Sequence, residues 1–163
     1  MANTQSMCTS FLGQLLSGGH QFGTIILVSR TSLTAPTIDS FKAALYLASA
    51  TINAATTAYT VTGEVTGTNY TAGGIAVTNG TAVTATNSSA TAGVAYWTPG
   101  ASLTYASVTL STAFDTVLIY NSTQNNTAVS VHTFGSQTIT AGTFTLTMPA
   151  NGTTTALLRL ATT

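Results

Sequence analysis

The chain has 163 residues and no formal net charge, and only 4% of its residues are charged, whereas an ordinary soluble domain is about 25% charged. Three well-separated cations cannot form the basic patch that binding to nucleic-acid phosphates requires, so we expect no nucleic-acid partner. A hydrophobic content of 44% also excludes the kind of disorder that low hydrophobicity and high charge produce. The charged residues are Arg30, Asp39, Lys42, Glu64, Asp115 and Arg159.

The first predicted element is a helix over Thr9–Leu16. A hydroxyl side chain at its start can cap the helix, apolar residues recur at helical spacing, and the Gly18-Gly19 pair ends it. We expect residues 1–22 to form an N-terminal helical arm and residues 23–163 to form a β-sandwich domain. The length of the chain predicts a single compact domain overall.

The rest of the chain is predicted to form strands, because threonine alternates with apolar residues and turn signals follow at short intervals. This pattern is typical of an antiparallel sandwich or barrel. We therefore predict an all-β protein, an antiparallel β-sandwich that is jelly-roll-like, with one short N-terminal helix. The strand candidates are Thr24–Arg30, Phe41–Ala48, Tyr59–Val65, Leu103–Leu110, Thr116–Tyr120, Ala128–Phe134, Phe144–Met148 and Ala156–Leu160.

Two stretches carry weaker signals. Residues Thr78–Gly93 are nearly all threonine, alanine, asparagine, serine and glycine. They lack a hydrophobic face, so we predict an exposed loop or a weak edge strand. Ala141-Gly142 is predicted to be a turn that separates two strands.

Nothing in the sequence predicts insertion in a membrane. The continuous apolar stretch Ile25–Val28 is far shorter than a membrane helix of about 20 residues. Residues 1–14 carry no basic residue, whereas an export signal begins with a positively charged region. The single cysteine, Cys8, cannot form an internal disulfide and is predicted to be a small buried residue.

Few residues of the chain are suited to catalysis. A hydrolase triad can be assembled from His132, Asp115 and a serine, but no Gly-x-Ser-x-Gly motif is present and nothing orders the three groups. We interpret His132 as a surface or interface histidine. His20 follows the glycine pair that ends the predicted helix, where its side chain can bind terminal carbonyl groups, so we assign it a structural role.

Metal, phosphate and glycosidase sites are also predicted to be absent. Two distant histidines, one cysteine and three scattered carboxylates have no metal-ligand spacing, and no glycine-rich loop carries the lysine of a phosphate-binding motif. A glycosidase would need two of Asp39, Glu64 and Asp115 to converge. We predict no catalytic, cofactor-binding or metal-binding residues, no cofactor and no enzyme activity. A glycan hydrolase that uses Glu64 and Asp115 is the enzymatic alternative.

The charged residues are predicted to be structural. Lys42 lies in one expected strand and Glu64 near the end of another, so their side chains can pair across strands. Such a pair contributes only about 0–1 kcal/mol when it is exposed. Asp39 precedes Phe41 and is expected to close a loop by bonding backbone amides.

Four segments of the sequence, taken in order, form a recognisable series. They are Phe11…Leu15-Leu16-Ser17-Gly18…His20…Phe22; Phe41-Lys42-Ala43-Ala44-Leu45-Tyr46-Leu47 with Ser49-Ala50-Thr51 and Thr57-Ala58-Tyr59; Gly63-Glu64-Val65 with Gly67 and Tyr70-Thr71-Ala72-Gly73-Gly74; and Leu118-Ile119-Tyr120-Asn121-Ser122. In this order they resemble a family of small virion proteins of tailed bacteriophages. The resemblance covers most of the chain and departs at Gly23–Ile38, which is longer than the usual link. It implies a place in the virion and no activity, and it carries no functional residues across.

The composition agrees with a coat component, because apolar and weakly charged surface is typical of permanent interfaces. We therefore predict a bacteriophage virion structural protein, foremost a head decoration or cement protein that stabilises the capsid shell. Its expected partners are the major capsid protein or other virion proteins, and its expected location is the virion, assembled in the bacterial host cytoplasm. A homo-oligomer is expected, with a trimer favoured. The alternatives are a tail fibre or tail-tip component that contacts the host surface and, outside viruses, an extracellular adhesin.

Overall fold

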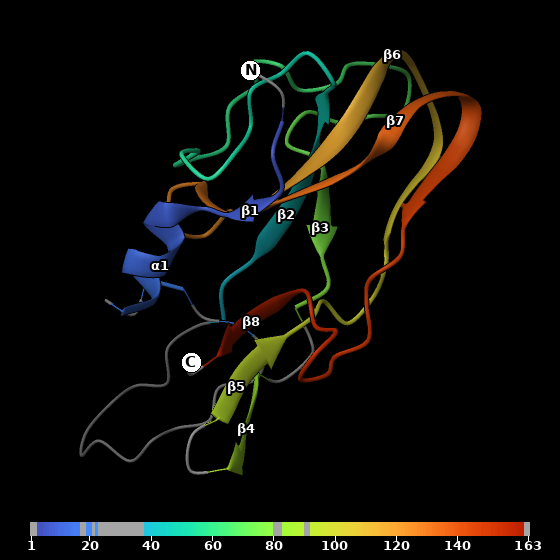
Figure 1. Cartoon of the computed structure of the whole chain (residues 1–163). Coiled ribbons are helices and arrows are strands. Elements are labelled where there is room, and N and C mark those ends of the chain that lie inside the picture. The colour runs from blue at the N-terminus through green and yellow to red at the C-terminus, as the bar shows by residue number, and fades with distance from the viewer. Residues whose placement is uncertain are drawn as a thin grey trace. The chain divides into compact units, whose positions relative to one another are not determined.

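The described part of the chain is built from β-strands and one short helix (Figure 1). The computed structural model describes residues 3–16, 19–20, 22, 38–79, 83–89 and 92–161. Its strands form two antiparallel sheets, which confirms the predicted class, an all-β sandwich-like protein with one short helix. The jelly-roll order of strands stays a prediction. The elements are β1 (Ser6–Met7), α1 (Thr9–Leu16), β2 (Phe41–Leu47), β3 (Ile75–Val77), β4 (Thr84–Ser89), β5 (Ala92–Trp97), β6 (Leu103–Asn121), β7 (Thr127–Leu146) and β8 (Leu158–Ala161).

The chain divides into two compact units. The larger unit consists of Met1–His20, Asp39–Val77 and Leu103–Leu146, and its sheet has the strand order β1-β7-β6-β2-β3. The N-terminal segment is therefore part of the larger unit, and the expected domain boundary after residue 22 stays a prediction.

β6 and β7 form one long hairpin in the larger sheet. The sequence predicts each of them as two shorter strands, but they run without interruption over 19 and 20 residues. Asn125 and Asn126 adopt positive φ angles of 52° and 56° in the turn between them, a conformation that asparagine tolerates better than most residues.

The predicted turn at Ala141-Gly142 is wrong, because this dipeptide lies inside β7. Ala141 has a φ of 47°, and the register between β6 and β7 shifts between Val108 and Leu110, which pair with Gly142 and Ile139. One residue in the left-handed region makes a bulge, which bends a strand without ending it. Turn chemistry in the sequence therefore marks a bend here and not a strand end.

Buried side chains of β2 and of the second half of β6 form much of the core of the larger unit. These two strands pair from Phe41–Asn121 to Leu47–Phe114. Along the hairpin, Phe114, Phe134 and Phe144 form an aromatic cluster with ring centroids 5.1–5.9 Å apart. Such ring pairs contribute about 0.5–1.5 kcal/mol each beyond the area that they bury.

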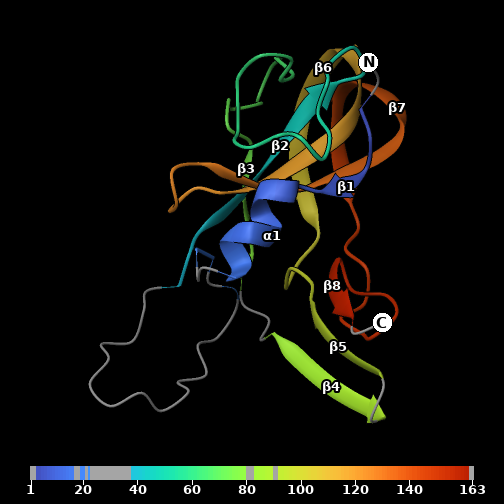
Figure 2. The ribbon, with the colours of Figure 1, turned by 60° about the vertical axis from the view of Figure 1, so that its left-hand side comes forward.

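The N-terminal segment packs on the larger unit (Figure 2). The helix α1 has the bounds that the sequence predicts, and Phe11 on its inner face is 1% exposed whereas Leu12 is 40% exposed. The short strand β1 pairs with β7. Cys8, which lies between β1 and α1 in the chain, is fully buried, as predicted. Burial raises the pKa of its thiol to about 11.

The predicted strand Tyr59–Val65 is wrong. These residues form turns, and their backbone pairing with strands is limited to isolated bridges, Glu64 with Tyr46 and the adjacent Ala58 with Thr127. Tyr59, Val61 and Val65 alternate with other residues as in a strand, but the segment is held by hydrogen bonds of the Glu64 carboxylate, described below, and not by a ladder of backbone hydrogen bonds.

The smaller unit consists of Gln21–Ile38, Thr78–Ser102 and Thr147–Thr163, with the strand order β4-β5-β8. β4 is an edge strand of this sheet, which confirms the edge-strand alternative for part of the threonine-rich stretch. Trp97 at the end of β5 is 2% exposed and packs against Phe22, with ring centroids 4.9 Å apart. The predicted strand Thr24–Arg30 lies outside the described residues. No helix of the described chain is long and apolar enough to span a membrane.

Candidate functional site

A buried carboxylate, Glu64, is the centre of a set of polar contacts in the larger unit. Its side chain belongs to a residue that is 6% exposed. Oε2 accepts a hydrogen bond from the Tyr59 hydroxyl at 2.6 Å, and Oε1 accepts one from the Tyr70 hydroxyl and one from the Gly73 backbone N–H, both at 2.7 Å. Hydrogen bonds to an ionised group contribute about 1.5–3 kcal/mol each. Glu64 thereby holds both ends of residues 59–74, which we call the tyrosine loop.

Three further tyrosines of the sheet surround the same region, and two of them, Tyr46 and Tyr120, bond the tyrosine loop. The hydroxyl groups of Tyr46, Tyr105 and Tyr120 donate to the backbone carbonyls of Thr60, Ala43 and Gly73 at 2.5, 2.7 and 2.8 Å. The rings also stack in two pairs, Tyr59 on Tyr120 at 4.8 Å and Tyr70 on Tyr105 at 5.9 Å. Burial raises the pKa of all five hydroxyl groups, and the negative charge of Glu64 raises it further. The hydroxyl groups therefore remain protonated and able to donate at neutral pH.

The tyrosine loop lies against β2 at very short range. Gly74 has a φ of 71°, and a Cβ atom built on it would lie 1.7 Å from the carbonyl oxygen of Ala43. Only glycine fits this position. The expected ion pair of Lys42 with Glu64 does not form among the described residues, because both carboxylate oxygens are already engaged by the loop.

A second buried network joins α1 to the turn between β6 and β7. His20 is 7% exposed, and its Nε2 lies 2.7 Å from Oε1 of Gln14 in α1. Its Nδ1 lies 3.0 Å from Nδ2 of Asn121, and the same amide nitrogen donates to Oδ2 of Asp39 at 2.7 Å. Gln124 in the turn donates to the other Asp39 oxygen at 3.2 Å. The structural role predicted for His20 is consistent with these contacts, although its described partners are side chains and not terminal carbonyl groups.

These contacts determine where the proton of His20 lies. The carbonyl oxygen of Gln14 can only accept, so Nε2 carries the hydrogen, and the amide nitrogen of Asn121 can only donate, so Nδ1 is the unprotonated acceptor. Burial lowers the pKa of His20, and the nearby Asp39 carboxylate opposes that shift. The network thus holds a neutral imidazole. Asp39 was expected to bond backbone amides, and its bonds include these two side-chain amides.

His132, Asp115 and a serine do not form a triad. His132 Nε2 lies 2.9 Å from Oγ of Ser130, two residues earlier in β7. Asp115 instead accepts hydrogen bonds from Asn3 and Thr116. Burial lowers the pKa of His132 to about 4, and Ser130 is 1% exposed. The histidine–serine pair therefore lacks a carboxylate that orients it.

The other predicted site residues are equally dispersed. Asp39, Glu64 and Asp115 each accept hydrogen bonds from a different set of residues, so none of these bonds joins two carboxylates. Within the described ranges, no group of three or more histidine, cysteine, aspartate or glutamate side chains is placed to hold a metal ion.

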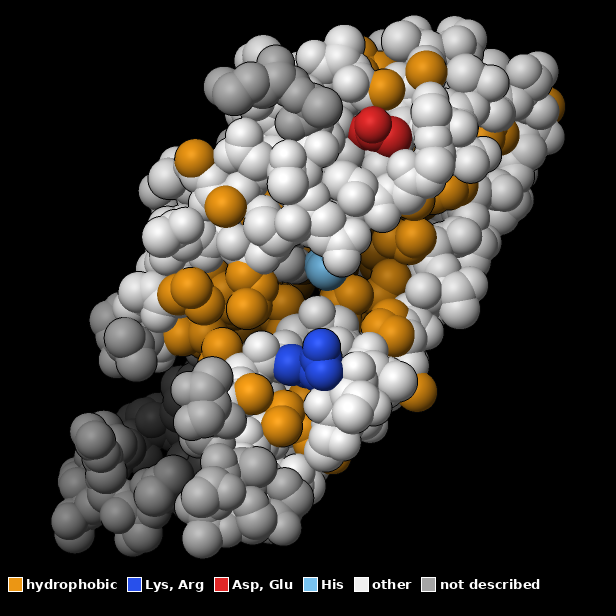
Figure 3. Space-filling model, viewed as in Figure 1, with side chains coloured by type: hydrophobic (Ala, Val, Ile, Leu, Met, Phe, Trp, Pro, Cys, Tyr) orange, Lys and Arg blue, Asp and Glu red, His pale blue; other side chains and the backbone are white. Residues whose placement is uncertain are grey.

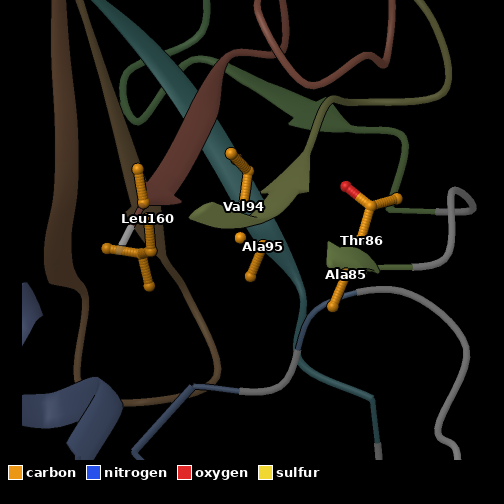
Figure 4. A pocket seen from close by; sticks show the side chains of 7 residues that line it. Ala85, Thr86, Val94, Ala95 and Leu160 are labelled. Atoms are coloured by element: carbon orange, nitrogen blue, oxygen red, sulfur yellow. The ribbon is translucent and has the colours of Figure 1, made fainter. Parts of the chain in front are cut away.

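A groove of about 290 Å³ lies on the sheet of the smaller unit (Figure 4). The labelled side chains in Figure 4 come from all three strands of that sheet, and Leu160 among them is 45% exposed. The lining is mostly small and apolar, with Thr86 as its hydroxyl group, so it offers space but no acid–base group. The lining residues are Ala85, Thr86, Gly93, Val94, Ala95, Leu160 and Ala161.

The face drawn in Figure 3 consists mainly of neutral polar side chains and backbone, with a few separate hydrophobic patches and very little charge. This agrees with the composition, in which 4% of residues are charged. Hydroxyl and amide groups hydrate such a surface in place of charged groups.

Sequence reasoning missed the tyrosine cluster. The tyrosines lie between positions 46 and 120, so no spacing rule connects them. The available signal was the pair Tyr59 and Tyr70 around a lone glutamate, together with the Gly73-Gly74 turn. Comparison of the chain with protein-family models, with curated protein sequences and with solved structures finds no match.

Proposed function

We propose that this protein is a structural subunit of a bacteriophage virion, foremost a head decoration protein that binds the capsid shell. The observation that carries the proposal is the use made of the buried carboxylates. Glu64 and Asp39 are 6% and 4% exposed; the oxygens of Glu64 join the two ends of the tyrosine loop, and those of Asp39 accept from the end of β6 and the turn that follows it. The buried acidic groups thus serve rigidity, which a shell component needs.

The surface supports the same proposal. Decoration proteins act by adding many weak contacts to a shell, so that binding stabilises the assembled state by mass action. A weakly charged surface with threonine-rich strands suits such permanent contacts, because little charge has to be desolvated when it is covered. The sequence segments resemble, in their order, small virion proteins of tailed bacteriophages. This resemblance is the reason for proposing a virion as the assembly.

Purified virions test the proposal through the copy number of the protein. We expect the protein in hundreds of copies per particle, comparable to the major capsid protein, when intact particles are quantified by mass spectrometry. Heads separated from tails should retain it. A handful of copies that stay with the tail fraction would overturn the head assignment and support the tail-fibre or tail-tip alternative. Absence from particles would overturn both.

The enzymatic alternative has a separate test. Both oxygens of Glu64 already accept hydrogen bonds from the protein, so a role as acid or nucleophile would require these bonds to break. We expect no hydrolysis of host envelope glycans by the purified protein. An activity that disappears in both Glu64→Ala and Asp115→Ala, with the fold retained, would support the hydrolase.

A further inference from the structure

The contacts of His20 join three segments that are distant in sequence. Gln14 belongs to α1, Asp39 precedes β2, and Asn121 ends β6. The imidazole also packs edge-on against Phe11 of α1 at 4.9 Å and stacks on Phe41 of β2 at 6.5 Å. The His20 side chain therefore joins the N-terminal segment to the end of the hairpin that β6 and β7 form.

Asn121 is the residue through which this link depends on protonation. Its Nδ2 donates to both His20 and Asp39, and its Oδ1 accepts from the backbone N–H groups of Thr123 and Gln124, each at 3.0 Å. The amide thus uses both donors and both acceptor positions, and it is 0% exposed. It has no spare orientation in which all four bonds survive.

A proton on Nδ1 of His20 removes the acceptor that Asn121 needs. Two N–H groups then face each other at a distance of 3.0 Å. Turning the amide over would offer oxygen to the imidazolium, but it would direct the amide hydrogens at the N–H groups of Thr123 and Gln124 and away from Asp39. Each arrangement breaks bonds in a buried site, where an unmet donor is destabilising.

The described groups that surround the imidazole are neutral apart from Asp39. α1 contributes the neutral Gln14 and Phe11, β2 contributes Phe41, and β6 and the turn contribute the neutral Asn121 and Gln124. Among the described residues, Asp39 is the charged group that acts on His20. It attracts an imidazolium, yet the amide of Asn121 stands between the two, so direct pairing requires Asn121 to leave.

We propose that His20, Asn121 and Asp39 form an acid-sensitive latch, which holds the N-terminal segment Asn3–His20 to the β6–β7 hairpin at neutral pH and releases it when His20 takes up a proton. Among the described hydrogen bonds of this segment, the remaining anchors carry no titratable acceptor apart from Asp115. They include the backbone bonds of Cys8 to Val129 and of Thr9 to Ala54. The latch is a property of the free protein, so it does not depend on the proposed place in a virion.

Amide hydrogen exchange on the full chain tests the latch. In the closed state the pKa of His20 is below its ordinary value, so opening takes up a proton and becomes easier as the pH falls below about 6.5. We expect the protection factors of the Cys8 and Thr9 amides, corrected for intrinsic exchange, to fall by up to about tenfold per pH unit between pH 6.5 and 5. Protection of the Leu118 amide, which exchanges only when the sheet itself opens, should stay higher than that of Cys8 and Thr9 at every pH in this range. Equal protection at all three amides, or no loss at Cys8 and Thr9, would overturn the proposal.

Two variants separate the latch from general acid sensitivity. His20→Gln cannot be protonated in this range, so the protection of Cys8 and Thr9 should become independent of pH. The matched control His132→Gln removes the other histidine, which lies in β7, and should leave the acid response as large as in the parent. Persistence of the response in His20→Gln, or its loss in His132→Gln, would contradict the latch.

A third variant should reverse the sign. Asn121→Asp keeps the acceptor for Thr123 and Gln124 but places a second carboxylate beside Asp39, so the site then needs the imidazolium. Protection of the Cys8 and Thr9 amides should rise, and not fall, as the pH is lowered from 7.5 to 5.5. If this variant does not fold, the ring nitrogen shifts of the parent remain decisive. At pH 7.5 they should show hydrogen on Nε2 of His20, and hydrogen on Nδ1 would overturn the proposal.

Discussion

The hydroxyl group of Tyr70 donates a hydrogen bond to Oε1 of Glu64, 2.7 Å away, while it accepts one from the backbone N–H of Leu45 at 3.0 Å. One side chain of the tyrosine loop thus connects the buried carboxylate to β2. This relationship makes Tyr70 the link between an irregular segment and a regular strand. The stability of the larger unit should therefore depend on a single hydroxyl group.

Tyr70→Phe should lower the free energy of unfolding by about 1–3 kcal/mol, because it leaves the Leu45 amide and one Glu64 bond unmet in a buried site. The measurement is chemical denaturation at pH 7. Tyr96→Phe is the matched control, since the Tyr96 hydroxyl makes no hydrogen bond within the described chain, and it should change the value by less than about 0.5 kcal/mol. Equal effects of the two variants would contradict this role of Tyr70.

Glu64→Gln should lower the free energy of unfolding and leave the fold unchanged. Glutamine is neutral and offers one carbonyl oxygen where the carboxylate offers two, so at least one of the bonds from Tyr59, Tyr70 and Gly73 loses its acceptor and the others lose the charge. We expect a loss of about 1.5–3 kcal/mol in the free energy of unfolding, with an unchanged far-ultraviolet dichroism spectrum. A variant as stable as the parent would show that the carboxylate does not hold the tyrosine loop.

Gly74→Ala should be among the most damaging substitutions in the chain. The new Cβ would lie 1.7 Å from the Ala43 carbonyl oxygen, and the φ of 71° is unfavourable for alanine. The loop must move, so we expect a loss of more than about 3 kcal/mol or failure to fold. Gly135→Ala in β7 has no atom within 4 Å of the new Cβ and should be neutral or slightly stabilising. Thermal unfolding of the two variants tests the contrast.

His132 should contribute to a decline of stability in acid. Burial lowers its pKa from 6.5 to about 4, so between these values the unfolded chain binds a proton that the folded chain does not. The stabilisation is complete above pH 6.5 and is lost as the pH falls toward 4, with a slope of up to about 1.4 kcal/mol per pH unit. His132→Gln should flatten the profile of unfolding free energy against pH in this range. An unchanged slope would exclude His132 as its source.

Cys8 should react with thiol reagents only after the N-terminal segment opens. Burial raises the pKa of the thiol to about 11, and the side chain is fully buried, so at pH 8 almost no accessible thiolate exists. We expect negligible labelling by a disulfide reagent in native buffer and labelling of one thiol per chain in denaturant. Fast labelling of the native protein would show that this segment opens readily.

Local sequence rules were sufficient for elements whose signals lie within a few residues. The helix Thr9–Leu16 has its cap, its apolar spacing and its glycine stop in one short stretch, and α1 has those bounds. The predicted strand Phe41–Ala48 agrees with β2, Phe41–Leu47, to within one residue. The sequence did not predict that β7 continues across Ala141, because this depends on its pairing with β6. It did not predict turns at Tyr59–Val65 either, because these depend on hydrogen bonds to the Glu64 carboxylate.

The sequence by itself determined the class of this protein, since alternation of threonine with apolar residues specifies strands and scarce charge specifies a neutral surface. It also indicated that the few charges are structural. Only the tertiary structure decided which partners they have, because the partners of Asp39 lie 82 and 85 residues away in the chain, and those of Glu64, 5 to 9 residues away, converge only when the loop folds back on itself. A buried carboxylate must find donors, and folding supplies whichever ones the sheet brings close. Here these are tyrosine hydroxyls for Glu64 and side-chain amides for Asp39.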